Sequence, residues 1–185
     1  MNSILPVRGH IVAIAVLAAV LFAAFDAGTA TAATTGGFSS VPPQAAGPLA
    51  KASVNVDRRT AVAPAGAPEP VVEAIEAANR ITRKPYKWGG GHGTWRDSGY
   101  DCSGTVSYVL HAAGLLKRSR DSTGLMSYGE PGAGDWITVY AHGSHAHVLI
   151  AGLRFDTSGR GEEGPRWRLE PNSARGYVKR HPTGL

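Results

Sequence analysis

The chain has 185 residues and a mass of 19.3 kDa, which suits one ordinary domain with an appendage and leaves little room for two. Hydrophobic residues make up 43% and charged residues 18%, so a packed core is possible and a wholly disordered chain is excluded. The single cysteine excludes an intramolecular disulfide and any thiolate-rich zinc or iron–sulfur site, while the net charge of +5 favours polyanions such as nucleic acid or an anionic cell envelope.

Residues 1–32 have the organisation of a secretory signal peptide. Arg8 lies in a first segment without acidic residues, residues 11–25 are uniformly apolar, and residues 30–32 read Ala-Thr-Ala, a pattern typical of cleavage sites. The apolar run is shorter than the roughly 20 residues that span a bilayer, and no basic flank follows it. We therefore expect export, removal of this segment, and no stable membrane anchor afterwards.

Residues 33–70 are rich in proline and alanine and predict a disordered linker. Six of the twelve prolines lie in this stretch, and Phe38 is its only aromatic residue. Such a composition buries too little apolar surface to offset the entropy lost on ordering. All four tryptophans and all six tyrosines lie between Tyr86 and Tyr177. We therefore expect the folded domain to be residues 71–185.

The remaining residues predict helices followed by strands. Apolar residues at helical spacing predict a helix over 71–81, which Pro85 ends. A glycine-rich loop over 86–101 leads into a second predicted helix over 102–113. Strand-like runs follow at residues 136–140, 145–151, 154–157, 167–169 and 177–181. This order predicts an α+β fold in which an antiparallel sheet packs against helices.

Cys102 is expected in the first turn of the second helix, directly after Asp101. The N-terminus of a helix stabilises a thiolate through its free N–H groups and its dipole, and it lowers the pKa of a thiol below the usual value of about 8.5. The same N–H groups can hydrogen-bond an oxyanion. A thiolate nucleophile also needs an acid to protonate the leaving group, and histidine is the usual one. A lone cysteine in a helix can also be an inert core residue, so the surrounding motifs must distinguish a nucleophile from a packing residue.

Two motifs on either side of the glycine-rich loop resemble the signature of NlpC-type cell-wall cysteine peptidases. Tyr-Lys-Trp-Gly-Gly occupies residues 86–90, and Asp-Cys-Ser-Gly occupies residues 101–104. Pro-Gly-Ala-Gly-Asp-Trp at 131–136 resembles the turn that precedes the family's first core strand. The resemblance covers roughly residues 71–160. It implies a papain-like NlpC-type α+β fold, with N-terminal helices packed on an antiparallel sheet.

The resemblance also implies a role for individual residues. Cys102 would be the nucleophile, a histidine the general base and acid, and Asp156 the residue that orients the histidine. Tyr86 would lie near the thiol and contact substrate or oxyanion, while Asp101 and Ser103 match positions that receive the free amino end of the substrate. The alternatives are that the tyrosine merely packs and that the first of these aspartates only caps the helix.

Two histidines compete for the role of base. His145 and His147 point to the same side of a predicted strand. His145 heads the strand and lies eleven residues before Asp156, close to the family's spacing, so we predict it as the base. His147 is the alternate, because it precedes a valine as the family's histidine often does. The other histidines considered lack a partner pattern and are predicted to be surface or packing residues: His92, His111 and His181.

This chain departs from the family pattern in two places. The loop between the two motifs is longer than usual, with Trp95 and Arg96 inserted, which leaves the substrate preference open. The third position is usually His, Asn or Gln, whereas Asp156 is an acid. An acid orients and stabilises an imidazolium well in other triads, so we expect the site to be active.

The resemblance implies a secreted, cell-wall-associated cysteine peptidase that cleaves peptidoglycan stem peptides. The usual bond in the family joins D-glutamate to diaminopimelate through the γ-carboxyl. We expect a monomer without metal or organic cofactor, bound to an anionic wall and not to nucleic acid. Two alternatives remain open. One is a zinc hydrolase whose ligands are His145 and His147 with either His142 or Asp156. The other is an inactive wall-binding module.

Overall fold

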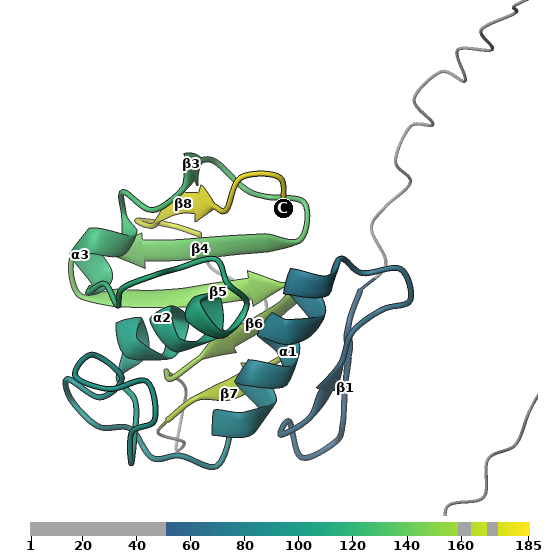
Figure 1. Ribbon diagram of the computed structural model, residues 1–185, viewed down its shortest axis with the longest axis horizontal. Helices are drawn as coiled ribbons and strands as arrows, with labels where there is room; N and C mark the ends of the chain where they lie inside the picture. The colour runs from purple at the N-terminus through teal and green to yellow at the C-terminus, as the bar shows by residue number, and fades with distance from the viewer. Residues whose placement is uncertain (1–50, 159–163, 170–173) are drawn as a thin grey trace, which may run out of the picture. The chain divides into compact units, whose positions relative to one another are not determined.

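The computed structural model describes residues 51–158, 164–169 and 174–185 (Figure 1). The predicted signal peptide and the predicted linker as far as residue 50 lie outside the described residues. None of the helices in the described ranges has the length and apolar character of a membrane-spanning segment.

The two predicted helices form where the apolar spacing placed them. Helix α1 spans Glu69–Ile81, with Pro70 in its first turn, where a missing N–H group costs no helical hydrogen bond. Helix α2 spans Cys102–Ala112 and begins after Asp101, whose Oδ1 accepts a hydrogen bond of 2.6 Å from the N–H of Gly104. An aspartate cap of this kind satisfies one of the free N–H groups at the start of a helix. The cap therefore fixes Cys102 as the first residue of α2.

Within the described residues, six strands form one antiparallel sheet in the order β3-β8-β4-β5-β6-β7. Their bounds are Glu130–Pro131 for β3, Ile137–His142 for β4, His145–Ile150 for β5, Leu153–Asp156 for β6, Arg166–Arg168 for β7 and Val178–His181 for β8. Each strand predicted from the sequence begins within one residue of its predicted start. The α+β prediction is confirmed. The two-residue β3 and the short helix α3 (Ser122–Leu125) were not predicted, because neither is long enough to show a periodicity.

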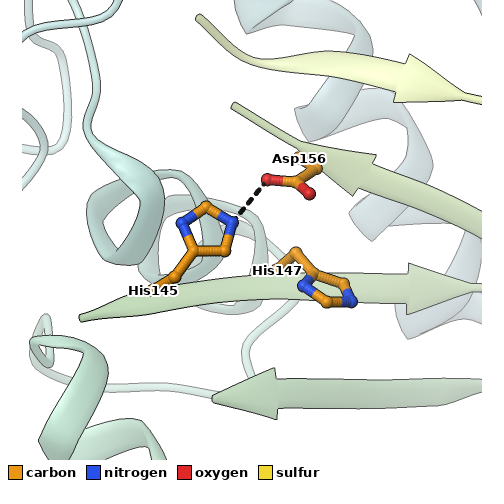
Figure 2. A group of neighbouring side chains, drawn as sticks. All are labelled: His145, His147 and Asp156. Atoms are coloured by element: carbon orange, nitrogen blue, oxygen red, sulfur yellow. Dashed lines mark hydrogen bonds and ion pairs between the residues drawn. The ribbon is translucent and has the colours of Figure 1, made fainter. Parts of the chain in front are cut away.

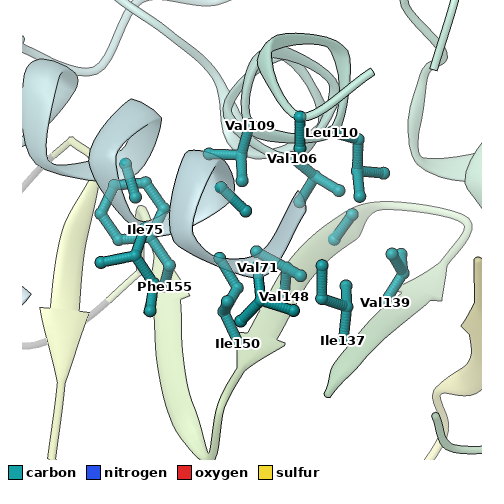
Figure 3. Packing of buried hydrophobic residues seen from close by; sticks show 14 of the residues in the cluster. Val71, Ile75, Val106, Val109, Leu110, Ile137, Val139, Val148, Ile150 and Phe155 are labelled. Carbon is teal, nitrogen blue, oxygen red and sulfur yellow. The ribbon is translucent and has the colours of Figure 1, made fainter. Parts of the chain in front are cut away.

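Helices α1 and α2 cover one face of the sheet, and the core lies between the helices and the sheet (Figures 1 and 3). The core side chains are aliphatic and aromatic: Val71 and Ile75 from α1, Val106, Val109 and Leu110 from α2, and Ile137, Val139, Val148, Ile150 and Phe155 from the sheet. Burying each such side chain contributes about 1.5–3 kcal/mol. Since α2 packs directly on β5, the same contacts hold Cys102 at a fixed position relative to His145.

Residues 51–70 are structured, so the prediction of a disordered linker was wrong over this range. Strands β1 (Ser53–Val54) and β2 (Ala61–Val62) form an antiparallel hairpin beside α1. Ala52 and Ala61 are buried in the core, and the N–H of Ala52 donates to the carbonyl of Ala151 over 2.9 Å. Composition misled here because small alanines, Val54 and backbone hydrogen bonds attach the hairpin without any large aromatic side chain.

Candidate active site

Cys102 is held between helix α2 and the glycine-rich loop that precedes it. A Cβ atom on Gly104 would collide with the carbonyl oxygen of Gly90, so only glycine lets the loop lie against the first turn of the helix. Asp101 ties the same two segments together. Its Oδ2 accepts a hydrogen bond of 3.0 Å from the N–H of Gly89, while its Oδ1 caps α2. The thiol therefore lies at a helix start that the loop leaves partly exposed.

The structure brings Cys102, His145 and Asp156 together. His145 is the first residue of β5, and its Nε2 lies 2.9 Å from Oδ1 of Asp156 at the end of β6 (Figure 2). Cys102 lies close enough to His145 for the imidazole to lower the pKa of its thiol. Asp156 is 2% exposed and also accepts hydrogen bonds from the N–H and Oγ of Ser158. The buried carboxylate of Asp156 thus holds the imidazole of His145 at Nε2.

The electrostatics of these three groups favour an ion pair. Burial would raise the pKa of Cys102, but hydrogen bonds from His145 and from the N–H of Ala146, with the charge of the imidazolium, outweigh burial and lower it. Burial disfavours a charged His145, yet its hydrogen bonds to Asp156 and Cys102 raise its pKa to about 9. Burial also opposes ionisation of Asp156, but the bond from His145, helped by Ser158, lowers its pKa to about 2. These shifts favour the thiolate, the imidazolium and the carboxylate over the neutral forms of the three groups.

His147, the alternate base, occupies a different environment. It is 2% exposed, and its ring stacks on Tyr140 with the centroids 5.0 Å apart and the planes 5° apart. Figure 2 shows its imidazole turned away from the bond between His145 and Asp156. His147 is therefore packed in the sheet, whereas His145 is the histidine that reaches Cys102.

The residues that could bind zinc lie close together, but two of them already form a hydrogen bond with each other. His145, His147 and Asp156 can each offer one ligand atom, and these atoms lie within 4.8 Å of one another. Tetrahedral zinc would draw its ligand atoms to roughly 3.3 Å apart, since each ligand lies about 2 Å from the metal. It would also compete with the 2.9 Å hydrogen bond from His145 to Asp156. His142 instead accepts a hydrogen bond at Nδ1 from the N–H of Ser144. The hydrogen-bonded arrangement therefore fits these residues better than a zinc site.

A cleft with a volume of about 470 Å³ opens over the thiol. The residues that line the cleft come from two parts of the chain. One part is the glycine-rich loop with the start of α2, and the other is the start of α3 with the β4–β5 turn. The lining residues include all three predicted substrate-binding residues, Tyr86, Asp101 and Ser103. Tyr86 is 36% exposed. The predicted residues are thus brought to one cleft.

His92 is a cleft residue that the sequence reasoning missed. It was predicted to be a surface or packing residue, and that prediction was wrong, because it lines the cleft. Its Nε2 lies 3.1 Å from Oδ1 of Asp101 and 3.1 Å from Oγ of Ser103. The available signal was its position in the glycine-rich loop between the two motifs. His111 does pack, with its ring stacked on the inserted Trp95 at 3.9 Å between centroids.

Tyr177 is a second neighbour of the site without a sequence signal. It precedes β8, and its ring contacts those of His142, His145 and His147 at centroid distances of 4.4, 6.4 and 4.9 Å. Burial, with the negative charge of Asp156, raises the pKa of its hydroxyl. The strand order of the sheet brings it here from 32 positions beyond His145, which no local pattern reveals.

Comparisons with known proteins match this part of the chain. Residues 83–161 match the model of the NlpC/P60 family. Over 95 residues, 48% of the chain, the sequence is 32% identical to the probable peptidoglycan endopeptidase LytE of Bacillus subtilis (strain 168). It is 34% identical over the same length to the probable endopeptidase Rv2190c of Mycobacterium tuberculosis (strain ATCC 25618 / H37Rv). These matches cover 27% and 23% of the relatives, so the chain spans about a quarter of their length.

A solved structure is also similar. The crystal structure of an NlpC/P60 family protein from Bacillus cereus ATCC 10987 aligns with a TM-score of 0.47 and 20% sequence identity. The alignment covers 60% of this chain and 40% of that chain.

Proposed function

We propose that this protein is a cysteine peptidase that hydrolyses peptide bonds in peptidoglycan stem peptides, because residues 83–161 match the model of the NlpC/P60 family that the motifs resemble. The observation that carries the proposal is the hydrogen bond of 2.9 Å between His145 and the carboxylate of Asp156, beside a Cys102 thiol whose pKa the same histidine lowers. A nucleophile, an acid–base group and an orienting carboxylate in this order are what acyl transfer through a thioester requires.

The proposed reaction has two halves. The Cys102 thiolate attacks the scissile carbonyl carbon, and N–H groups of the first turn of α2 stabilise the oxyanion. The tetrahedral intermediate collapses to a thioester as His145 donates its proton to the departing amine. His145 then takes a proton from water, which attacks the thioester and releases the acid and the thiolate. Asp156 keeps the imidazole oriented and stabilises its charged form throughout, and no metal or organic cofactor takes part.

The substrate and location follow from the family and the charge. The proposed bond joins D-glutamate to diaminopimelate through the γ-carboxyl, with Tyr86, Asp101 and Ser103 contacting the bound peptide. The peptidoglycan named in one relative supports a wall substrate. A net charge of +5 suits an anionic wall and supports wall association after secretion through residues 1–32. We propose that the protein acts there as a monomer and binds neither nucleic acid nor membrane.

Hydrolysis of purified peptidoglycan and of synthetic stem peptides tests this proposal. The full chain is compared with Cys102→Ala, with chain alkylated by iodoacetamide, and with chain treated with a metal chelator. We expect the alanine variant and the alkylated chain to lose activity and the chelated chain to keep it. Loss with chelator alone would instead establish the zinc hydrolase. Binding without cleavage by the unmodified chain would establish the inactive wall-binding module.

A further inference from the structure

We propose that the inserted part of the glycine-rich loop and the segment between α2 and α3 form a cationic groove that binds a phosphodiester-linked anionic polymer of the cell wall. The cations of this groove are Lys117, Arg118 and Arg120. The inference rests on the proposed function only for the location of the protein, because the groove lies outside the catalytic residues. It gives the inserted residues a role that the proposed reaction does not use.

The groove consists of two hollows that adjoin at Lys117 and Arg118, since both residues line both hollows. The first hollow has a volume of about 450 Å³ and lies between these cations and residues 93–95 of the inserted loop. The second has a volume of about 360 Å³ and continues to Arg120. His92 lines both the first hollow and the catalytic cleft. A polymer in the groove would therefore lie beside the cleft.

Hydrogen bonds and ring stacking hold the two sides of the groove in place. Oγ of Ser119 donates a hydrogen bond of 3.2 Å to the carbonyl oxygen of His92, which joins the segment after α2 to the loop. The N–H of Arg120 donates over 3.0 Å to Oγ of Ser107, a fully buried residue of α2. The inserted tryptophan stacks on a histidine of the same helix. Both sides are thus attached to α2, so the groove is formed before any ligand binds.

The positive charges of the groove are not neutralised by the described part of the domain. Lys117 and Arg118 are exposed, and neither forms an ion pair with a described residue. Arg120 donates from its guanidinium to the carbonyl oxygen of Gly124, which leaves its charge uncompensated. Among the described residues, no acidic side chain lines either hollow.

The acidic residues nearest to the groove in sequence are engaged elsewhere. Asp97 pairs with Lys87 at 2.6 Å. Asp121 caps α3, where its Oδ1 accepts from the N–H of Gly124, and it lines the catalytic cleft. Glu130 lies 3.8 Å from His181. The groove is therefore complementary to a polyanion.

The chemistry of the groove favours a repeating phosphodiester without nucleobases. Several cations along two adjoining hollows match a chain of anions better than a single carboxylate. Two of the cations are arginines, whose planar fork binds phosphate oxygens in pairs. Stacking of nucleobases needs exposed aromatic faces, whereas Tyr128 is 4% exposed and the ring of Trp95 already stacks on His111. A polymer whose phosphates join sugars or polyols makes no such demand.

Calorimetry with the full chain and synthetic poly(glycerol phosphate) tests the inference. We expect binding that weakens as the salt concentration rises. A chain with both Lys117→Gln and Arg118→Gln should bind about tenfold more weakly, the effect of two surface ion pairs. The slope of log K against log salt should become shallower by about 1.4, at roughly 0.7 for each lost phosphate contact. Both residues are exposed, so the thermal midpoint should not change.

A chain with both Arg83→Gln and Lys84→Gln is the matched control. It loses the same two positive charges from exposed residues that line neither hollow, so its affinity should stay within twofold of the unmodified chain. The inference is overturned if the unmodified chain does not bind the polymer, or if the groove variant loses no more affinity than the control. Tenfold tighter binding of single-stranded DNA or poly-L-glutamate with the same number of charges would also overturn it.

Hydrolysis of a soluble stem peptide separates this inference from the proposed function. The groove variant should cleave the peptide with the kcat/KM of the unmodified chain, because neither substituted residue lines the catalytic cleft. If the unmodified chain binds the polymer through the groove but cleaves no stem peptide, the proposed function fails and the inference stands. If it cleaves the peptide but the groove variant binds polymer as tightly as the unmodified chain, the inference fails and the proposed function stands.

Discussion

At the scale of single residues, the charge state of His145 determines the pH range in which the site works. The active form holds a thiolate on Cys102 and a proton on His145, so activity requires a pH above the pKa of the first and below that of the second. The pKa of His145 is raised to about 9, chiefly by hydrogen bonds that outweigh burial. We therefore expect kcat/KM to fall as the pH rises through about 9, where the imidazolium loses its proton.

Asp156→Asn should move this alkaline limit to lower pH. The substitution removes the negative charge and replaces a charge-assisted hydrogen bond by a weaker bond to a neutral amide oxygen, so the pKa of His145 falls. The pH profile of kcat/KM for both proteins measures the shift. A limit that stays in place would mean that the carboxylate does not stabilise the charged base.

The two histidines of β5 should respond differently to substitution. His145→Ala removes the acid and base, and we expect kcat to fall by about 10²–10⁴-fold. His147→Ala removes a buried ring stacked on Tyr140, which should lower the free energy of unfolding by about 2–4 kcal/mol and reduce kcat less than tenfold. Hydrolysis assays and urea unfolding distinguish these effects. A folded but inactive His147→Ala protein would reverse the assignment of the base.

Spacing and motifs predicted most residues of the site. The eleven-residue separation from His145 to Asp156 is close to the spacing of the family that the motifs resemble, and this resemblance predicted the pair. Alternation alone would not have chosen between the two histidines, because the register of β5 and β6 puts Asp156 opposite His147. His92 and Tyr177 could not be found in this way. The first depends on the path of an irregular glycine-rich loop, and the second on a strand order that brings β8 beside β4. Neither arrangement produces a periodic pattern of residues in the sequence.

At the scale of secondary-structure elements, Asn79 joins three parts of the fold. Its Oδ1 accepts hydrogen bonds from the N–H of Ala61 in β2 and from Nε1 of Trp167 in β7, and its Nδ2 donates to the carbonyl of Ala61, all at 2.9 Å. Trp167 is 0% exposed, so its indole N–H has no access to solvent as a substitute. The side chain of one helical residue thus fixes the hairpin and the edge strand to α1.

Asn79→Ala should destabilise the protein without touching the site. The change leaves the buried N–H of Trp167 unsatisfied and frees both polar groups of Ala61, at a cost of about 2–4 kcal/mol in the free energy of unfolding. Denaturant unfolding measures this loss, and kcat under native conditions should match that of the unmodified chain. Equal stability of the two proteins would contradict the joining role of Asn79.

The elements that were predicted and those that were missed differ in how they are stabilised. Helices α1 and α2 and strands β4 to β6 bury regular patterns of apolar side chains, which periodicity detects. Strands β1 and β2 are held by backbone hydrogen bonds and by a side chain 18 positions away. Their proline- and alanine-rich composition matches that of flexible chains. Composition therefore could not predict that β1 and β2 are ordered.

At the scale of the whole molecule, the folded domain extends further toward the N-terminus than its composition suggested. A chain that begins at residue 51 retains the hairpin, whereas one that begins at residue 71 loses it. The shorter chain also loses the bonds between Arg59 and Thr82, in which each residue donates to the other's carbonyl oxygen. Together with the bond from Ala52 to Ala151 and the two between Ala61 and Asn79, five hydrogen bonds are lost. At roughly 1 kcal/mol for each hydrogen bond, the shorter chain should be less stable by about 5 kcal/mol.

Thermal unfolding of the two truncated chains measures this difference. The chain beginning at residue 51 should melt at the higher temperature, and both chains should cleave stem peptides at similar rates well below their midpoints. Identical midpoints would show that residues 51–70 add nothing to the stability of the domain.

The hydrogen bonds of Asn79 also bear on the order in which the protein folds. Its bonds to Ala61 close a chain segment of 18 residues, and its bond to Trp167 closes one of 88 residues. The entropic cost of closing a flexible loop rises with its length, by about 1.4 kcal/mol between these two lengths. We therefore expect the hairpin to dock on α1 early and the tryptophan to dock late. Burial of Trp167 would then mark the completion of a sheet whose catalytic strands, β5 and β6, are already paired.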